Sequence, residues 1–259
     1  MIFIFILLGI IQGVTEPIPI SSSGHLLIFQ KLFNYKIDYE ILSIITNLGS
    51  FLAIFTVFKD RIICILKSYF TKKNKYEYTY LYKIIIASIP ALIVGLIVTK
   101  MELFKYLENN IKFVGISLLI TALLLFTIKN KVGNKNELSY KDAFIIGLFQ
   151  VVALIPGISR SGATIVGGMN RNLDRNTAFD FSFMLYIPIS LATSILGIIK
   201  LINSNLTIHE ISLYLISMIV SFIFTYITIN WFKNIILKGK LIYFVYYCMI
   251  IGTFILLLL

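Results

Sequence analysis

The sequence predicts an all-α integral membrane protein, and three observations support that fold class. Hydrophobic residues make up 58% of the 259 residues and charged residues only 14%, whereas a typical soluble domain has about 25% charged residues. The mean hydropathy is +0.91, and six apolar stretches are long enough to cross a bilayer. Two further apolar stretches are interrupted by proline, glycine and serine, which predicts helical hairpins rather than plain spanning helices.

About six spanning helices are expected, because a crossing needs about 20 apolar residues. The stretches are 41–58, 81–99, 112–128, 181–199, 211–232 and 241–259. The interrupted stretches are 2–28 and 143–169. Each is expected to form a helix, a break and a short helix that returns to the same side, since irregular backbone at membrane depth needs cover from protein or a wet cavity.

The two interrupted stretches resemble each other when the sequence is shifted by 138 residues. Seven identities align without a gap, among them Gly9 with Gly147 and Gln12 with Gln150. Three expected spanning helices separate the copies, so the second hairpin should enter from the opposite side. We therefore expect one transmembrane domain, residues 1–259, built as an inverted-topology repeat. Repeat 1 covers about 1–130 and repeat 2 about 140–259, and the two re-entrant hairpins meet near the midplane.

The net charge of +11, from 23 Lys and Arg against 12 Asp and Glu, does not indicate a nucleic-acid partner. The chain has no zinc-finger spacing, RNP-type motif or basic helix. Sixteen of the basic residues fall in the segments 59–83, 129–141, 171–175 and 233–240, all expected as loops on one side, and six fall on the other side. The positive-inside rule assigns the first group to the cytoplasm. Both termini and the opening of the first hairpin are then expected outside.

The first hairpin carries an unusual density of polar residues for its depth. Gln12 and Glu16 lie four residues apart, on one face of a helix that Pro17 then ends. An ionisable residue here indicates function, although Glu16 could instead only brace the hairpin. The returning helix opens on Ser21, Ser22, Ser23 and Gly24, followed by His25. Hydroxyls and free amides at a helix start form an anion site, although serine is also a good helix cap.

The second hairpin places an arginine between two serines at its own helix start. The segment runs from Pro156 to Thr164 and contains Ser159, Arg160, Ser161 and Gly162. Packing explains such an arginine poorly, whereas its planar, permanently charged fork matches phosphate oxygens. Two amide-rich helix starts that face each other would add to the positive field. The pooled groups predict the binding or cleavage of a phosphate ester or anhydride at the membrane.

The chain resembles the undecaprenyl-diphosphate phosphatase (bacitracin-resistance) family. The two signatures of this family, (E/Q)GxTExxPISSSGH and PGxSRSGAT, stand at Gln12 to His25 and at Pro156 to Thr164. A third element, a Phe-Ser-Phe segment before a helix with proline, matches Ala178 to Phe183 followed by Pro188. Length and hydropathy agree from end to end.

The resemblance implies hydrolysis of undecaprenyl diphosphate to the monophosphate and inorganic phosphate. This reaction recycles the lipid carrier for peptidoglycan synthesis and protects against bacitracin. It implies a multi-pass protein of the bacterial cytoplasmic membrane whose site faces outward, a polyprenyl diphosphate and the bilayer as partners, and a divalent cation, Mg2+ or Ca2+, as cofactor. A homodimer is left open.

The resemblance also implies roles for the motif residues. Glu16 would bind the metal or act as base, with Gln12 assisting; Ser22 would contact the phosphate and could attack it; His25 would be nucleophile or acid–base partner; Arg160 would clamp the diphosphate. The remaining substrate-binding residues would be Ser21, Ser23, Gly24, Ser159, Ser161, Gly162 and Thr164. Whether Ser22, His25 or water attacks is left open.

Two departures and one rival function accompany the resemblance. The family usually carries Arg where Cys248 stands, and Gln or His where Asn47 stands. Inverted repeats with broken helices also occur in transporters, so a polyprenyl phosphate flippase is the alternative. Asymmetry favours the enzyme, because the second copy has Leu154 and Ala163 where the first has Glu16 and His25.

Overall fold

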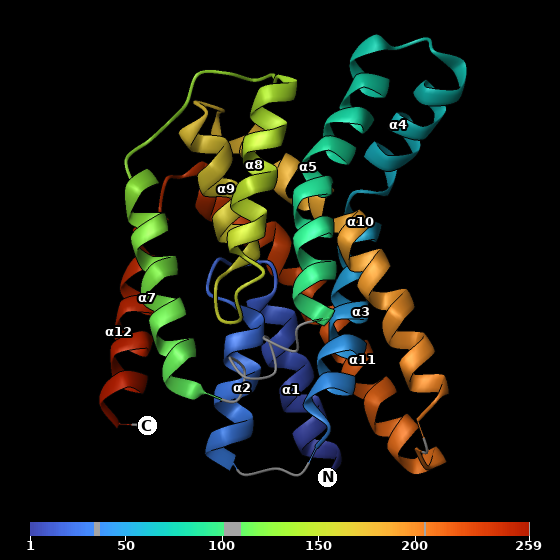
Figure 1. Ribbon diagram of the computed structural model, residues 1–259, viewed down its shortest axis with the longest axis vertical. Coiled ribbons are helices and arrows are strands. Elements are labelled where there is room, and N and C mark those ends of the chain that lie inside the picture. Colours follow the sequence, from blue (N-terminus) through green and yellow to red (C-terminus); the bar gives the residue numbers. More distant parts are fainter. Residues whose placement is uncertain (34–36, 101–109, 205, 259) are drawn as a thin grey trace.

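The computed structural model describes residues 1–33, 37–100, 110–204 and 206–258, and in this part of the chain every regular element is an α-helix. The helices are α1 (Ile2–Thr15), α2 (Ser22–Phe33), α3 (Tyr39–Val57), α4 (Lys59–Thr71), α5 (Lys75–Lys100), α7 (Ile111–Ile128), α8 (Tyr140–Val152), α9 (Arg160–Asn170), α10 (Arg175–Ile202), α11 (Ile208–Leu237) and α12 (Ile242–Leu258). They form an elongated bundle (Figure 1). The prediction of an all-α membrane protein is confirmed.

Five helical segments within the described residues are long and apolar enough to cross a membrane. Five of the expected stretches fall in α3, α5, α7, α10 and α11, whereas 241–259 forms α12, which at 17 residues is a shorter apolar helix. Several helices begin earlier than the apolar stretch because polar residues cap them. Asp174 accepts a hydrogen bond from the Thr177 amide at the start of α10, and Thr207 forms a capping box with Glu210 at the start of α11.

The expectation of a loop at 59–83 is wrong, because this segment contains α4 and the first turns of α5. The chain bends at Phe58, which has φ −97° and ψ 8°. Ile62 and Ile65 then pack against the main hydrophobic core, and Arg61 Nη1 forms an ion pair with Glu77 Oε1 at 2.7 Å. The high density of lysine in this segment obscured a helix with one apolar face.

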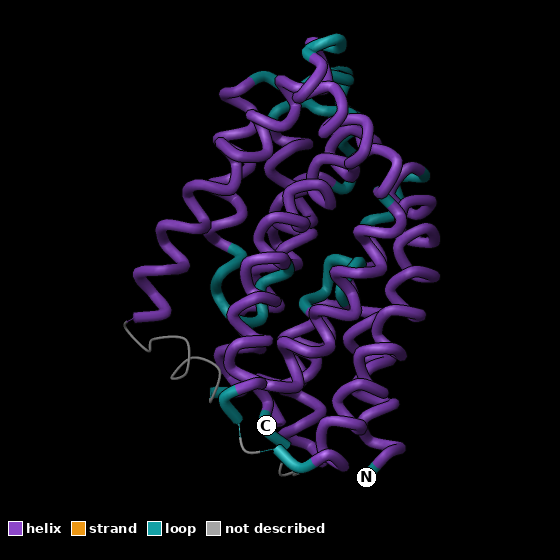
Figure 2. Tube along the Cα trace, turned by 90° about the vertical axis from the view of Figure 1, so that its right-hand side faces the viewer, coloured by secondary structure: helices purple, strands orange, loops and turns teal. Residues whose placement is uncertain are grey.

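The two interrupted stretches form helical hairpins that enter the bundle from opposite ends. Figure 1 shows α1 and α2 in the lower half and α8 and α9 in the upper half, with their connecting loops facing each other. Figure 2 shows these loops at mid-height, surrounded by helices. Irregular backbone at this depth is covered by protein, as the physics of a bilayer requires.

Two glycines at equivalent positions of the repeat, Gly9 and Gly147, allow the hairpins to pack closely against neighbouring helices. A Cβ built on Gly9 of α1 would lie 2.6 Å from the Ser217 carbonyl oxygen of α11, and one on Gly147 of α8 would lie 2.4 Å from the Ala87 carbonyl oxygen of α5. Helix α1 therefore packs on α11 as α8 packs on α5. This exchange of neighbours supports an inverted repeat, whose boundaries stay a prediction.

The segments expected in the cytoplasm gather at one end of the molecule. Figure 1 shows α4, the segment before α8, and the connections α9–α10 and α11–α12 at the top, with both ends of the chain in the lower half. Arg175 joins two of these segments, donating from Nε to the Lys131 carbonyl (3.2 Å) and from Nη1 to the Leu237 carbonyl (3.3 Å). Which membrane side this end faces stays a prediction. Lys36 and Lys105, expected on the other side, lie outside the described residues.

Candidate active site

Both returning helices begin at mid-depth with a serine that caps them. Ser21 Oγ accepts a hydrogen bond from the Gly24 amide at 3.2 Å, and Ser159 Oγ accepts one from the Gly162 amide at 3.1 Å. In each copy the Oγ of the capping serine also lies near the Oγ of the serine two residues later. The distance is 3.3 Å between Ser21 and Ser23 and 3.2 Å between Ser159 and Ser161. The first amides of α2 and α9 have no partner inside their own helix and carry the positive end of its dipole. The repeat thus builds two similar turns, each of which has the amide and hydroxyl donors that an anion site needs.

The carboxylate of Glu16 lies between the two turns. Its Oε1 accepts a hydrogen bond from Arg160 Nη2 at 2.8 Å. Its Oε2 accepts one from Ser22 Oγ at 2.5 Å and one from Gln12 Nε2 at 3.0 Å. The side chains of Glu16 and Arg160 are only 10% and 16% exposed. Because neither charge is well solvated, the loss of one partner would leave the other nearly unpaired, which is costly.

Arg160 is held in place by an aromatic ring that sequence reasoning missed. Its guanidinium carbon lies 3.7 Å from the centroid of the Tyr186 ring in α10, a cation–π contact. The Tyr186 hydroxyl donates to Asn47 Oδ1 of α3 at 2.8 Å. Arg160 Nη1 is buried and has no hydrogen-bond partner in the part of the chain that the structure describes. A buried donor is rarely left unpaired, so this atom is available to an incoming anion.

A cavity of about 100 Å³ joins these groups. The predicted residues that line it are Glu16, Ser21, Ser22, Ser23, Ser159, Arg160 and Ser161. Gly24 and Gly162 contribute the capping amides described above. Thr164 lies one turn into α9, where its hydroxyl bonds to the Arg160 carbonyl (2.9 Å) and to Ser182 Oγ (2.5 Å). Thr164 therefore braces α9 against α10.

His25 is turned toward α12, and neither it nor Gln12 lines the cavity. Its Nδ1 lies 2.7 Å from the Ser21 carbonyl oxygen and its Nε2 lies 2.7 Å from the Tyr247 hydroxyl. Both ring nitrogens are thus occupied. The sequence placed His25 beside the serines correctly but gave no sign of Tyr247, which is 222 residues away along the chain.

The second copy lacks the acidic centre of the first. Leu154 occupies the position of Glu16. Gln150, which matches Gln12, is 1% exposed, and neither of its polar side-chain atoms has a hydrogen-bond partner in the described structure. The second hairpin supplies the arginine and the first supplies the carboxylate, so one site requires both copies.

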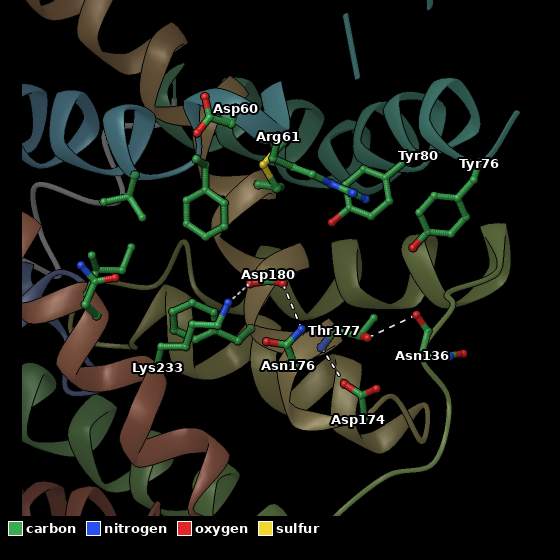
Figure 3. Close-up of a pocket in the computed structure, with 16 residues that line it drawn as sticks. Asp60, Arg61, Tyr76, Tyr80, Asn136, Asp174, Asn176, Thr177, Asp180 and Lys233 are labelled. Atoms are coloured by element: carbon green, nitrogen blue, oxygen red, sulfur yellow. Dashed lines mark hydrogen bonds and ion pairs between the residues drawn. The ribbon is translucent and has the colours of Figure 1, made fainter. Parts of the chain in front are cut away.

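A second cavity, of about 570 Å³, lies nearer the end with the basic loops, and none of the predicted site residues line it. Its polar groups largely satisfy one another, as Figure 3 shows. Asp180 pairs with Lys233 (2.9 Å) and accepts from Asn176 (3.2 Å), while Thr177 donates to the Asn136 carbonyl (3.3 Å). The small cavity between the hairpins, with its unpaired arginine nitrogen, is therefore the candidate active site.

Comparison with known proteins shows the family of this chain. The model of the family described as bacitracin resistance protein BacA matches residues 5–254. The chain belongs to the BacA family. It is 45% identical to a Bacillus cereus protein named undecaprenyl-diphosphatase 1, over 96% of this chain and 94% of that protein. It is 41% identical to undecaprenyl-diphosphatase of Oceanobacillus iheyensis, over 98% and 96% of the two chains.

Asn47 and Cys248, the two expected departures from the family pattern, both contact parts of the structure near the site. Asn47 accepts the hydrogen bond from Tyr186 and so supports Arg160 indirectly. Cys248 is fully buried in α12, and its Sγ lies 3.9 Å from the Pro19 carbonyl oxygen of the first hairpin loop. A neutral thiol suits this dry contact, whereas an arginine there would have to find a counter-charge.

The divalent cation expected from the family resemblance would have few protein ligands among the described residues. No cluster of three or more His, Cys, Asp or Glu side chains occurs among the described residues. Glu16 is the single carboxylate lining the small cavity, and the amide of Gln12 lies next to it. Mg2+ is commonly held by one or two carboxylates together with substrate phosphates and water. The donor set fits a cation that binds with the substrate.

Proposed function

We propose that this membrane protein hydrolyses undecaprenyl diphosphate to undecaprenyl phosphate and inorganic phosphate. The observation that carries this function is the binding of one carboxylate, Glu16, by a hydroxyl and a guanidinium from the starts of two facing helices. The names of the BacA relatives support the choice of substrate. The polyprenyl chain remains in the apolar surroundings of the bundle.

Ser22 and Glu16 are placed to form a nucleophile and its base. The Ser22 hydroxyl already donates to Glu16 Oε2, so Glu16 can take this proton as Oγ attacks the terminal phosphorus. The bond between that phosphorus and the bridging oxygen breaks, and undecaprenyl phosphate leaves. Water then hydrolyses the phosphoserine to inorganic phosphate. In the alternative route Glu16 deprotonates a water that attacks phosphorus directly, and Ser22 only orients the carboxylate.

Arg160 and the two helix starts stabilise the charge that develops on the phosphoryl oxygens. The free Nη1 can bind the diphosphate while Nη2 stays near Glu16. Donors that are fixed before the reaction cost no reorganisation when the charge develops, which is the main source of catalysis at such sites. Because the Tyr186 ring supports the guanidinium, Arg160 is pre-organised.

A divalent cation, Mg2+ or Ca2+, completes the proposed site. Glu16 would hold it, with the Gln12 amide oxygen as a second ligand and substrate phosphate and water as the rest. When bound, such a cation neutralises phosphate charge and polarises the phosphoryl oxygens.

Phosphate release from polyprenyl diphosphate by purified protein in detergent tests the function. The wild-type protein should release phosphate, whereas Glu16→Gln and Arg160→Met should abolish release. Glu137→Gln is the matched control, because Glu137 is exposed in the segment before α8. Substrate binding without phosphate release by the wild-type protein would contradict the enzyme and favour a carrier.

A flippase of polyprenyl phosphate is the second candidate, because the hairpins enter from opposite ends and meet at mid-depth. The asymmetry of the site favours the phosphatase. Glu16 occurs in the first copy and has no counterpart in the second. A carrier needs no such acid–base group, whereas a phosphatase does. Transport of a labelled polyprenyl phosphate into vesicles by the Glu16→Gln protein would support a carrier activity separate from hydrolysis.

We further propose that the protein lies in the bacterial cytoplasmic membrane with the basic end inside and the site open to the outer face. Cysteine labelling in intact cells tests this orientation. In a Cys64→Ser background, Phe70→Cys in α4 should resist a membrane-impermeant maleimide, and Ile208→Cys should react, since these side chains are 79% and 87% exposed at opposite ends. The reverse pattern would contradict the orientation.

A homodimer is the remaining proposal. The site described above is complete within one chain, so activity does not require it. Mass determination of the protein–detergent complex by light scattering separates a monomer from a dimer.

A further inference from the structure

Ser21, the residue before α2, has a left-handed backbone conformation, with φ +68°. Among residues other than glycine, only Asn and Asp adopt this conformation with any frequency. The equivalent serine of the second copy, Ser159, has an ordinary φ of −70°. There the left-handed residue is Gly157, at φ +88°, where glycine adopts the conformation without strain. The first turn therefore needs support that the second does not.

His25 supplies that support. The Ser21 carbonyl oxygen accepts from the His25 backbone amide at 3.2 Å and lies 2.7 Å from His25 Nδ1. In the second copy the Ser159 carbonyl accepts from the Ala163 amide at 2.9 Å, and alanine has no side-chain donor to add. The histidine thus occurs only in the copy whose serine is strained.

The Ser21 carbonyl fixes the tautomer of this histidine, and Tyr247 binds the other ring nitrogen. A carbonyl oxygen can only accept, so Nδ1 must carry the proton. The ring is 5% exposed and no acidic side chain bonds to it among the described residues, which favours the neutral form. Nε2 is then an acceptor, and it receives the Tyr247 hydroxyl at 2.7 Å.

We propose that His25 is a positioning residue held by Tyr247, and that its Nδ1–H keeps the Ser21 turn in the shape that places Ser22 against Glu16. The proposal assigns Tyr247 to the machinery of the site and makes His25 neither nucleophile nor base. Both ring nitrogens are committed to these two bonds, so neither is free to reach phosphorus or a water.

Nitrogen NMR of a single-histidine protein tests the tautomer without any assay of activity. The chain has two histidines, and His209 is exposed in the first turn of α11, so His209→Asn leaves only His25. With 15N-labelled histidine, Nδ1 should resonate as a protonated nitrogen and Nε2 as an unprotonated one at neutral pH. A proton on Nε2 would overturn the proposal.

Tyr247→Phe in the same background should remove the hydrogen bond to Nε2 and therefore shift the Nε2 resonance. Tyr246→Phe is the matched control, because Tyr246 is 59% exposed on α12 and should leave both resonances unchanged. An unchanged Nε2 resonance in Tyr247→Phe would contradict the assigned partner.

Isosteric substitutions of His25 form the second test, and this test rests on the proposed phosphatase. The Asn side-chain amide nitrogen occupies the place of Nδ1, whereas that of Gln occupies the place of Nε2. His25→Asn should retain turnover within about tenfold of wild type, and His25→Gln should fall about tenfold or more below His25→Asn, since a lost hydrogen bond to a buried carbonyl costs that much. The pH profile of His25→Asn should keep the wild-type shape.

Complete loss of turnover in both variants, with unchanged melting temperatures, would show that the imidazole itself transfers protons or attacks, and would overturn the proposal. Failure of the phosphatase proposal gives a different result, because the wild-type protein would then release no phosphate while the NMR experiment still reports the tautomer.

Discussion

Ser22 and Arg160 bind the two oxygens of one carboxylate, that of Glu16, from opposite sides. The shift of 138 residues that aligns the two hairpins also aligns Ser22 with Arg160. Equivalent positions of a duplicated turn have therefore diverged into a hydroxyl donor and a permanent cation. Because the hairpins meet from opposite ends, the two groups face the same carboxylate rather than lying on separate surfaces.

Replacing Ser22 separates the two routes of attack. Ser22→Ala should lower kcat by about 100-fold or more if its hydroxyl is deprotonated in the reaction, and rapid-quench labelling of the wild-type protein should then trap a phosphoenzyme. Ser212→Ala, at an exposed position of α11, is the control. Substantial turnover of Ser22→Ala without a phosphoenzyme would instead favour direct attack by water.

Replacing Tyr186 tests the support of Arg160. Tyr186→Leu removes the ring beneath the guanidinium and should weaken substrate binding by up to about 30-fold, since a desolvated cation–π contact contributes about 2 kcal/mol. Tyr186→Phe keeps the ring and loses the hydroxyl that bonds to Asn47, so its KM should lie between those of wild type and Tyr186→Leu. Equal KM values for the Phe and Leu variants would indicate that the hydroxyl, not the ring, matters.

Removal of divalent cations should abolish phosphate release, and Mg2+ or Ca2+ should restore it. Gln12→Glu should lower the cation concentration needed for half-maximal activity, because it adds a second carboxylate beside Glu16 and hard cations prefer charged oxygen ligands. Gln12→Ala should raise that concentration. Full activity in the presence of a chelator would contradict the proposed cation.

A larger residue at Gly147 should destabilise the second hairpin. The added methyl of Gly147→Ala would meet the Ala87 carbonyl oxygen at 2.4 Å, and overpacking of this kind costs about 1–3 kcal/mol. The melting temperature in detergent should fall. Gly95→Ala is the matched control in α5, because its Cβ would lie 4.0 Å from its nearest neighbour, Leu154. An equal melting temperature for both variants would show that α8 can move away from α5 at no cost.

Much of the fold and of the site could be predicted from local patterns. Apolar length identified α3, α5, α7, α10 and α11, and proline and serine in the middle of two apolar stretches identified the hairpins. The hydropathy pattern did not predict α4, because the many charged residues of this segment obscured its apolar face.

The sequence by itself determined that the protein is an all-α membrane protein, and it predicted that two turns bind anions and that Glu16, Ser22 and Arg160 act together. These inferences depend on residues that lie close together in the chain or are repeated in it. Only the tertiary structure decided that Tyr186 and Asn47 support Arg160, and that Tyr247 binds His25 and turns it from the cavity. These contacts join helices separated by 139 and 222 residues. They depend on how closely the helices pack and on which rotamer each buried side chain adopts, and hydropathy and motif spacing carry neither kind of information.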